Sequence, residues 1–350
     1  MKDGDWFLGY SGRDDLPGAG LTFGRFRSGI YCLKEPSIAF ADPDVGDQPL
    51  PGEDGVRLGL DYQRSVTVTM ELGIDTVNAP ADRTYPRKII KGRVIGDWPD
   101  EPHILELLKR TGNRASWNAD GIAMMRQVWR ADSVRAGAGR VAWLRHRKAG
   151  RTRFLFGRPR RFAEGGGELS SQGYTPVVAD FVAIDDKFLD VTEKTATLWE
   201  YPLRYMRPVP GRVISHHPIE PWDPGNSRRT ASIVQAGQLS TYPIITIHGP
   251  CANPKITLTD RWAVQLALTL KSGEYVTIDA RSFARTVVKY LPNGSYSSVA
   301  HKLTRASPRL AEMTIPPGTW HARLDYTRTT TAQKQGPRVE IIWRDAFAGW

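Results

Sequence analysis

Short alternations of apolar and polar residues dominate the last third of the chain, and they predict β-strands. A period of two places every second side chain on the same face of a strand. Valine or leucine occupies every second position from Val264 to Leu270, so we expect that face to belong to a core. The pattern predicts strands at residues 244–248, 255–259, 262–270, 274–279, 286–291, 311–315, 320–326 and 338–343.

Turn sequences separate several of these predicted strands. They are Lys-Ser-Gly at 271–273, Pro-Asn-Gly at 292–294 and Pro-Pro-Gly at 316–318. Glycine and proline supply the backbone angles that tight turns require. Short strands with regular turns are typical of two antiparallel sheets packed face to face. We therefore predict an antiparallel β-sandwich over residues 239–350.

The first half of the chain combines strands with one helix. Val66, Val68 and Met70 alternate with threonines, which predicts a half-buried strand, and residues 174–185 predict another. Residues 118–135 carry apolar side chains at helical spacing, with Asn118 or Asp120 as the expected N-cap. Residues 141–162 read as a hairpin that turns at Ala149-Gly150, and residues 41–55 read as a long loop.

Proline divides the chain into two parts. Six prolines are scattered between residues 202 and 224, and each one fixes φ and lacks the N–H group that a strand ladder uses. We therefore predict a linker at 196–238 between an N-terminal domain at 1–195 and the C-terminal sandwich at 239–350. A chain of 350 residues is long enough for two domains with their own cores.

Charge is unevenly distributed along the chain, whose net charge is +11. Residues 1–60 contain ten acidic and six basic side chains, a balance of −4, whereas residues 140–161 contain nine basic side chains and no acidic ones. Two complementary surfaces of this kind suit contact between copies of a protein, or with an acidic partner. The candidate interface residues are Arg151, Arg153, Arg158, Arg160 and Arg161. A solvated basic face and contact with DNA are the alternatives.

No motif in the sequence indicates catalysis. Cys32 and Cys251 are far apart, which supports neither a disulfide framework nor a cysteine zinc site. The adjacent His216 and His217 would point to opposite sides of an extended segment, so they do not suit one metal. Nucleophile-elbow, metalloprotease and phosphate-loop motifs are absent. We expect no enzyme activity, no cofactor, no metal and no membrane span.

The order of several motifs resembles the distal tail proteins of siphophages, especially those of actinobacteria. In the C-terminal half these motifs are GPCANPKITL, WAVQLALTLKSGEYVTIDAR, MTIPPGTWHARLDYT and VEIIWRDAFAG. In the N-terminal half they are DGVRLGLDY, the segment 129–135, FLFGRPRRF and VVADFVAIDDKF. The resemblance therefore covers nearly the whole chain, although each motif is short.

The resemblance implies a mainly β protein of the tail tip. Its N-terminal β-sandwich, with a helix and an extended hairpin, would form a homo-hexameric ring, and its C-terminal domain would be a galectin-like antiparallel β-sandwich. Such a ring joins the tube of a long non-contractile tail to the tail-tip hub and the host-attachment apparatus. The implied partners are the tail tube protein, the tape measure protein and a tail hub or tail-associated protein. Assembly in the host cytoplasm and a place in the virion follow, and DNA would only pass through the channel.

Carbohydrate binding is the alternative function. Exposed aromatic side chains on a β-sandwich stack against sugar rings, and galectin-like folds are often lectins. Trp320 is the candidate glycan contact, because Trp262 and Trp343 lie beside aliphatic residues within predicted strands and are expected to fill the core. This reading gives a β-sandwich protein that recognises host cell-wall glycans.

Overall fold

A computed structural model describes two compact units in this chain. It covers residues 1–12, 16–50, 54, 56–61, 63–75, 113–199, 229–329 and 336–350. Unit 1 consists of Met1–Val191 together with Phe347–Trp350, and unit 2 consists of Thr192–Ala346. The fold is mainly β, as the sequence predicts, and α2 is its one long helix among the described residues.

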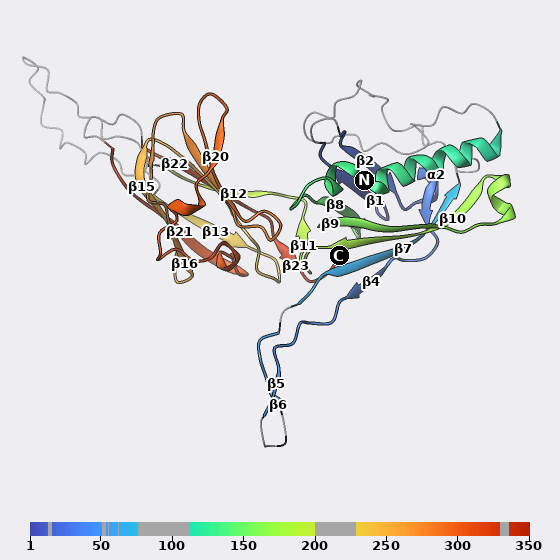
Figure 1. Cartoon of the computed structure of the whole chain (residues 1–350), viewed down its shortest axis with the longest axis horizontal. Coiled ribbons are helices and arrows are strands. Elements are labelled where there is room, and N and C mark those ends of the chain that lie inside the picture. The colour runs from blue at the N-terminus through green and yellow to red at the C-terminus, as the bar shows by residue number, and fades with distance from the viewer. Residues whose placement is uncertain are drawn as a thin grey trace, which may run out of the picture. The chain divides into compact units, whose positions relative to one another are not determined.

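Unit 1 is built on an antiparallel sheet in the order β2-β1-β8-β9-β10-β7-β3, with β4 paired to β7 and β11 paired to β9 (Figure 1). Short 3-10 turns lie at Phe26–Ser28 and Glu168–Gln172. The strands are β1 Trp6–Tyr10, β2 Ala19–Phe23, β3 Ile30–Cys32, β4 Ser37–Phe40, β7 Val66–Asp75, β8 Ala142–Lys148, β9 Arg151–Glu164, β10 Tyr174–Ala183 and β11 Phe188–Asp190.

Alternation places the core of unit 1 on one face of its long strands. Val66, Val68 and Met70 of β7 are fully buried, and so are Ala179 and Phe181 of β10. The predicted strand at 66–70 is confirmed and extends to Asp75. Because β7 and β10 pair over nine register positions, their buried side chains form one continuous layer.

Helix α2, Arg114–Arg130, packs on this core through Met125 and Trp129. The predicted N-cap is wrong: Asn113 caps the helix, and its side chain accepts a hydrogen bond from the Ser116 N–H at 3.0 Å. Asn118 lies inside the helix, buried, with its amide 2.8 Å from the Thr175 hydroxyl. The hydrogen bond to Thr175 therefore explains why a polar residue is buried at position 118, where the sequence predicts a cap.

The helix ends earlier than its apolar spacing suggests. Ala131 adopts a left-handed conformation at φ 49°, which stops α2 and starts the short helix α3, Asp132–Arg135. The glycines at 137 and 139 follow α3. The sequence pattern ran the two helices together because their apolar spacing continues across the break.

We call residues 41–65, between β4 and β7, the arm, and its described residues form a projection from the sheet (Figure 1). The sequence predicts a long loop at 41–55, whereas the structure pairs β5, Gln48–Pro49, with β6, Val56–Arg57. The Gly59 N–H donates a hydrogen bond to Asp47 Oδ1 at 2.8 Å. A Cβ on Gly59 would collide with the Gly46 backbone, so glycine permits the close approach of the two sides.

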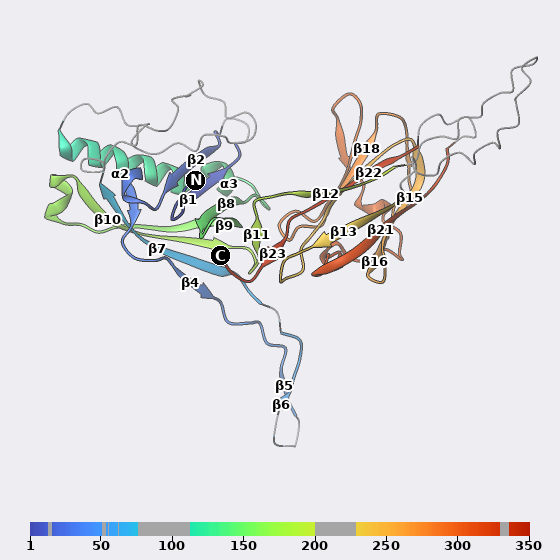
Figure 2. The same ribbon diagram turned by 180° about the vertical axis from the view of Figure 1, so that it is seen from behind.

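Unit 2 is a sandwich of two antiparallel sheets around one core (Figure 2). Its first sheet has the order β12-β22-β14-β18-β19-β20, and its second has the order β13-β21-β15-β16, with β17 paired to β15. The strands are β12 Lys194–Trp199, β13 Thr230–Gln235, β14 Ile244–His248, β15 Cys251–Leu258, β16 Trp262–Gln265, β17 Thr269–Leu270, β18 Tyr275–Asp279, β19 Thr286–Tyr290, β20 Tyr296–Ser298, β21 Gly318–Thr327 and β22 Arg338–Trp343.

Most of the strands predicted for the last third are present, with two corrections. The strand predicted at 262–270 is broken into β16 and β17, because the Ala267 N–H bonds to the Lys302 carbonyl at 2.8 Å. The strand predicted at 311–315 is wrong. A 3-10 turn, Leu310–Glu312, lies there instead, and the Glu312 carboxylate accepts a hydrogen bond from the Arg309 N–H at 3.1 Å.

Parts of the predicted linker at 196–238 are strands of unit 2. Ala196 and Leu198 of β12 are buried, as is Ile233 of β13. These short alternations were hidden by the prolines that surround them. Residues 200–228 lie outside the described residues.

The chain passes between the units twice, because unit 2 is inserted before the last four residues of unit 1. Strand β23, Ala346–Phe347, spans the return. The ring of Trp350 lies edge-on to Trp6, His146 and Phe188, with centroid distances of 5.0, 5.2 and 4.9 Å. Residues 347–350 therefore complete the aromatic packing of unit 1.

Candidate functional site

The basic hairpin predicted at 141–162 is formed by β8 and β9. It turns at Ala149 and Gly150, both at positive φ (51° and 75°), as the two-residue turn of a hairpin requires. The strands pair from Ala142 opposite Gly157 to Lys148 opposite Arg151. This register fixes the direction of Arg151 and Arg153 in the candidate interface.

A β-bulge exposes two of these arginines. The register of β9 against β10 shifts so that Arg160 and Arg161 together face the single residue Asp180. Consecutive side chains on a regular strand point to opposite faces, but a bulge turns both outward. Arg160, Arg161 and also Arg151, at the turn, are exposed.

Two other arginines of the candidate interface have internal roles. Arg158 donates hydrogen bonds to the carbonyls of Arg140 at 2.9 Å and Gly137 at 2.8 Å, which ties the segment after α3 to β9. Arg153 is buried, with its guanidinium 3.6 Å from the ring centroid of Phe347 and a hydrogen bond to the Gly349 carbonyl. The structure therefore separates the five into three exposed and two structural residues.

Some of the acidic N-terminal side chains neutralise this hairpin within the same chain. Asp3 pairs with Arg147 at 3.2 Å and accepts a hydrogen bond from the Gly150 N–H at 3.0 Å. Glu35 pairs with Lys148, and this lowers the pKa of Glu35. Charges that the sequence assigned to two opposite surfaces are thus partly paired inside one subunit.

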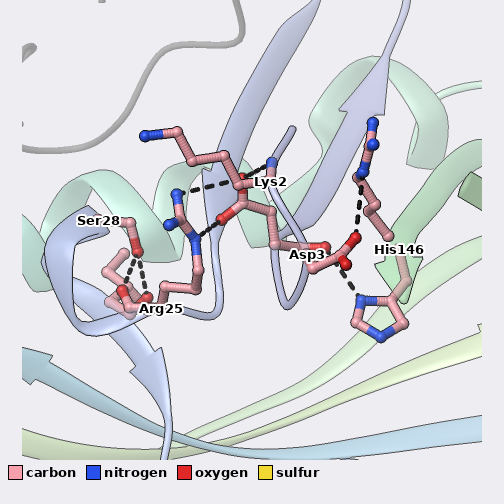
Figure 3. Close-up of polar contacts among 8 residues, drawn as sticks. Lys2, Asp3, Arg25, Ser28 and His146 are labelled. Atoms are coloured by element: carbon pink, nitrogen blue, oxygen red, sulfur yellow. Dashed lines mark hydrogen bonds and ion pairs between the residues drawn. The ribbon is translucent and has the colours of Figure 1, made fainter. Parts of the chain in front are cut away.

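A buried ion pair anchors the N-terminus beside the hairpin (Figure 3). The carboxylate of Asp5 is fully buried, pairs with Arg25 and accepts a hydrogen bond from the Lys2 N–H at 2.5 Å. The Ser28 hydroxyl lies 2.6 Å from the carbonyl oxygens of both Arg25 and Ile30 and donates a hydrogen bond to them. His146 Nδ1 lies 3.0 Å from the Asp5 carbonyl. Removing the carboxylate would leave a cation with poor solvation.

A cavity of about 710 Å³ opens beside this anchor. Its lining includes Trp6, His146, Trp350, Lys34 and Lys148. The Trp6 and His146 rings stack with centroids 3.9 Å apart and planes at 12°. Burial lowers the pKa of His146, against the opposing effect of its hydrogen bond to Asp5. The cationic lysines on the lining are paired: Lys34 with Glu71 at 2.6 Å, and Lys148 with Glu35.

The arm carries apolar side chains that are more than half exposed among the described residues. Leu58 is 81% exposed and Leu60 is 73% exposed, and Val45 and Val56 are also exposed. Six acidic and two basic residues occur between positions 41 and 65, a balance of −4. Neighbouring exposed apolar side chains of this kind are typical of surfaces that contact another protein. The sequence predicts a loop at 41–55 but not the exposure of Leu58 and Leu60, because that exposure depends on the pairing of β5 with β6.

Trp320, the candidate glycan contact, lies on β21 of unit 2 and is half-buried. Its indole N–H donates a hydrogen bond to the Pro316 carbonyl at 2.8 Å, and the Arg261 guanidinium covers one ring face at 4.2 Å from its centroid. Trp262 and Trp343 are buried in the core of unit 2, as the sequence predicts. Trp320 therefore has less free aromatic surface than its position in the sequence suggests.

Within the described residues, histidine, cysteine and carboxylate side chains form no cluster that could hold a metal ion. Burial raises the pKa of the Cys32 and Cys251 thiols to about 12, which makes them poor nucleophiles. None of the described helices has the length and apolar character needed to cross a membrane. The exposed leucines of the arm and the exposed Arg151, Arg160 and Arg161 are therefore the surface features taken up below.

Comparison with known proteins gives similarity at the level of structure. No family model matches the sequence, and no curated protein matches it. Solved structures that match over almost the whole chain include the SPP1 Dit protein and the phage P2 baseplate.

Three of the matching structures are as follows in identity, coverage and TM-score. One is the SPP1 Dit protein, described as a paradigm of the hub adsorption apparatus in phages that infect Gram-positive bacteria. It has 10% identity and a TM-score of 0.45, with 98% of this chain and 99% of that chain covered. Another is the phage P2 baseplate in its activated conformation with Ca, at 10% identity and a TM-score of 0.46, with 97% of each chain covered. The same baseplate with Sr gives 9% identity and a TM-score of 0.46, again with 97% of each chain covered.

Proposed function

We propose that this protein is a structural component of a phage tail tip, in which copies of the chain associate through unit 1 into a closed ring of six. The ring joins the tube of a long non-contractile tail to the tail-tip hub and the host-attachment apparatus. Its neighbours would be the tail tube, tape measure and hub proteins, and its place would be the virion. The order of the sequence motifs and the mainly β two-unit fold support this proposal.

The observation that carries the proposal is the arm. Leu58 and Leu60 are each more than 70% exposed on a narrow two-stranded projection. A projection this thin has no core of its own, so its apolar side chains gain burial only against another surface. Burying a leucine side chain contributes about 2 kcal/mol. Contact with the next copy would bury both leucines, and repetition of that contact around an axis closes a ring.

Charge supports contact between copies. The arm has a balance of −4, whereas Arg151, Arg160 and Arg161 are exposed and form no ion pair with any other residue that the structure describes. Opposite charges on two surfaces speed their encounter and fix their orientation more than they add affinity. We therefore expect the arginines to fix the orientation of the two copies, and the leucines to contribute most of the binding free energy.

Oligomeric state tests the proposal directly. Light scattering after size exclusion, together with end-on averages from electron microscopy, should show a ring of six for the unmodified chain. The double variant Leu58→Ser/Leu60→Ser should shift the protein towards monomer by at least tenfold in dissociation constant. The triple variant Arg151→Glu/Arg160→Glu/Arg161→Glu should slow assembly, most strongly at low salt.

The matched control is Val234→Ser, which removes an exposed apolar side chain from unit 2. It should leave the oligomer unchanged. A chain that stays monomeric at high concentration, or a ring that survives the double leucine variant, contradicts the proposal.

A further inference from the structure

A row of aromatic side chains crosses the first sheet of unit 2. His248 faces Tyr275, Tyr275 faces Tyr290, and Tyr290 faces Tyr296, one from each of the strands β14, β18, β19 and β20. Successive ring centroids are 5.3, 4.7 and 5.9 Å apart, and the central tyrosine pair is stacked with planes at 11°. We call these four residues the aromatic row.

The aromatic row lies on the face of the sheet that points away from the sandwich core. The preceding or following residues, such as Ile247 and Val276, are fully buried in that core. Among the described strands, β20 is the edge of this sheet, and Tyr296 on it is 74% exposed. The ring of Tyr296 therefore presents a largely free face at the end of the stack. Strand β20 is labelled in Figure 1, and β18 in Figure 2.

At the adjacent register position on the same face, three of the four side chains carry an uncharged hydroxyl group and the fourth is Val288. Thr246 faces Thr277, with their hydroxyls 3.5 Å apart, and Ser298 faces Val288. The cation that continues the aromatic row, Arg338, is paired with Glu340. Burial lowers the pKa of His248, so its ring is neutral near pH 7. This surface holds no unpaired charge among its described residues.

These contacts select the chemistry of the ligand. A nucleic acid or an acidic polymer requires unpaired cations along its path, and the row has none. A protein partner gains most of its affinity from a desolvated apolar centre, whereas three of the four side chains beside the row carry hydroxyl groups. A neutral sugar suits both the aromatic row and the hydroxyl groups beside it. Its C–H face stacks on an aromatic ring, and its hydroxyls form hydrogen bonds with the phenol and threonine hydroxyls.

We propose that the aromatic row is a binding site for neutral oligosaccharides, with Tyr296 as the stacking residue and Tyr275 and Tyr290 as hydrogen-bonding residues. Stacking between the rings holds them in place before the ligand arrives, which reduces the entropy lost on binding. The site belongs to unit 2 and goes beyond ring formation. It also relocates carbohydrate recognition from Trp320, whose indole is already engaged.

A glycan array that carries neutral, sulfated and carboxylated oligosaccharides tests the proposal with the full chain. We expect binding to neutral members. Calorimetric titration with the best neutral oligosaccharide should then show at least a tenfold loss of affinity for Tyr290→Ala/Tyr296→Ala. Tyr296→Phe keeps the stacking ring and should retain most of the affinity, and Trp320→Phe should stay within twofold of the unmodified chain.

Thermal unfolding identifies any variant that fails to fold, and Tyr296→Phe remains informative because it changes a single exposed hydroxyl. Binding only to sulfated or carboxylated sugars overturns the proposal, as does the absence of binding at millimolar sugar. Retained affinity in the double alanine variant overturns it too. A double variant that alters only association with copies or with another protein identifies a protein contact and overturns the sugar site. Light scattering reports ring formation separately, so the two proposals can fail independently.

Discussion

Asp5 is the residue on which the local order of the N-terminus depends. It brings together the Arg25 guanidinium and the Lys2 N–H, and its backbone carbonyl holds the ring of His146. The sequence offers ten acids in its first sixty residues and gives no sign that this one is buried. Burial arises because β1 lies between β2 and β8, which only the completed sheet reveals.

Replacing Asp5 by asparagine should destabilise unit 1 by about 3 kcal/mol, because the mostly buried Arg25 guanidinium loses the negative charge of the Asp5 carboxylate. Denaturant unfolding of unit 1 measures the change. Asp3→Asn is the matched control: Asp3 is exposed, and its ion pair with Arg147 should contribute at most about 1 kcal/mol. Equal losses for the two variants would contradict the assignment.

His146 predicts a pH dependence of stability. Its folded-state pKa lies below the unfolded value of about 6.5. Between the two values the unfolded chain binds a proton that the folded chain does not. The free energy of unfolding should therefore fall as pH drops below about 7, and the loss should be complete below the folded pKa.

The variant His146→Phe retains a ring beside Trp6 and removes the titration. The charged neighbours Asp5, Glu35 and Lys148 are present in both proteins, so their contributions cancel in the difference. Denaturant unfolding at pH 7.5 and 5.5 should show a smaller decrease for the variant. The same decrease in both proteins would rule out His146 as the source.

At the scale of elements, strand β22 decides the integrity of unit 2. It lies between β12 and β14, and Val339 and Ile341 on it are fully buried. Its predicted bounds, 338–343, are those of the structure. Alternation determined this strand so well because the opposite sheet buries one of its faces and leaves the other outside the core.

Ile341→Asp should unfold unit 2 and leave unit 1 folded. The free-energy cost of burying an unpaired carboxylate in the core of unit 2 should exceed the stability of that unit. Hydrogen exchange resolved by peptide should show lost protection in 230–346 and retained protection in β7 and β10. Ile342→Asp is the control on the opposite, half-buried face and should have a smaller effect. Simultaneous unfolding of both units would show that they are not independent.

At the scale of the whole molecule, chain connectivity determines how the units can be separated. Residues 194–199 of β12 pair with β22 through six register positions, and residues 347–350 return to unit 1. The linker predicted from proline content would allow one cut to release two domains. The inserted topology does not, because β12 and β13 lie on either side of that segment and both belong to unit 2.

A protease site inserted between residues 205 and 225 should give two fragments that still elute together in size exclusion. The β12–β22 pairing and the aromatic packing of Trp350 would hold them together. Denaturant should separate the fragments, and the uninserted chain should stay intact under the same digestion. Separation of the fragments without denaturant would contradict this account of the topology.

The sequence by itself determined the mainly β class, most strands of unit 2, the hairpin turn at Ala149-Gly150 and the absence of catalytic motifs. Each of these depends on local periodicity or turn chemistry, which neighbouring residues carry in full. Only the tertiary structure decided which arginines are free, that Asn118 is internal, and that residues 347–350 belong to unit 1. It also placed four aromatic rings, one from each of four neighbouring strands, in a single row. Burial, register and pairing across the sheets depend on contacts between distant residues, so no local pattern could show them.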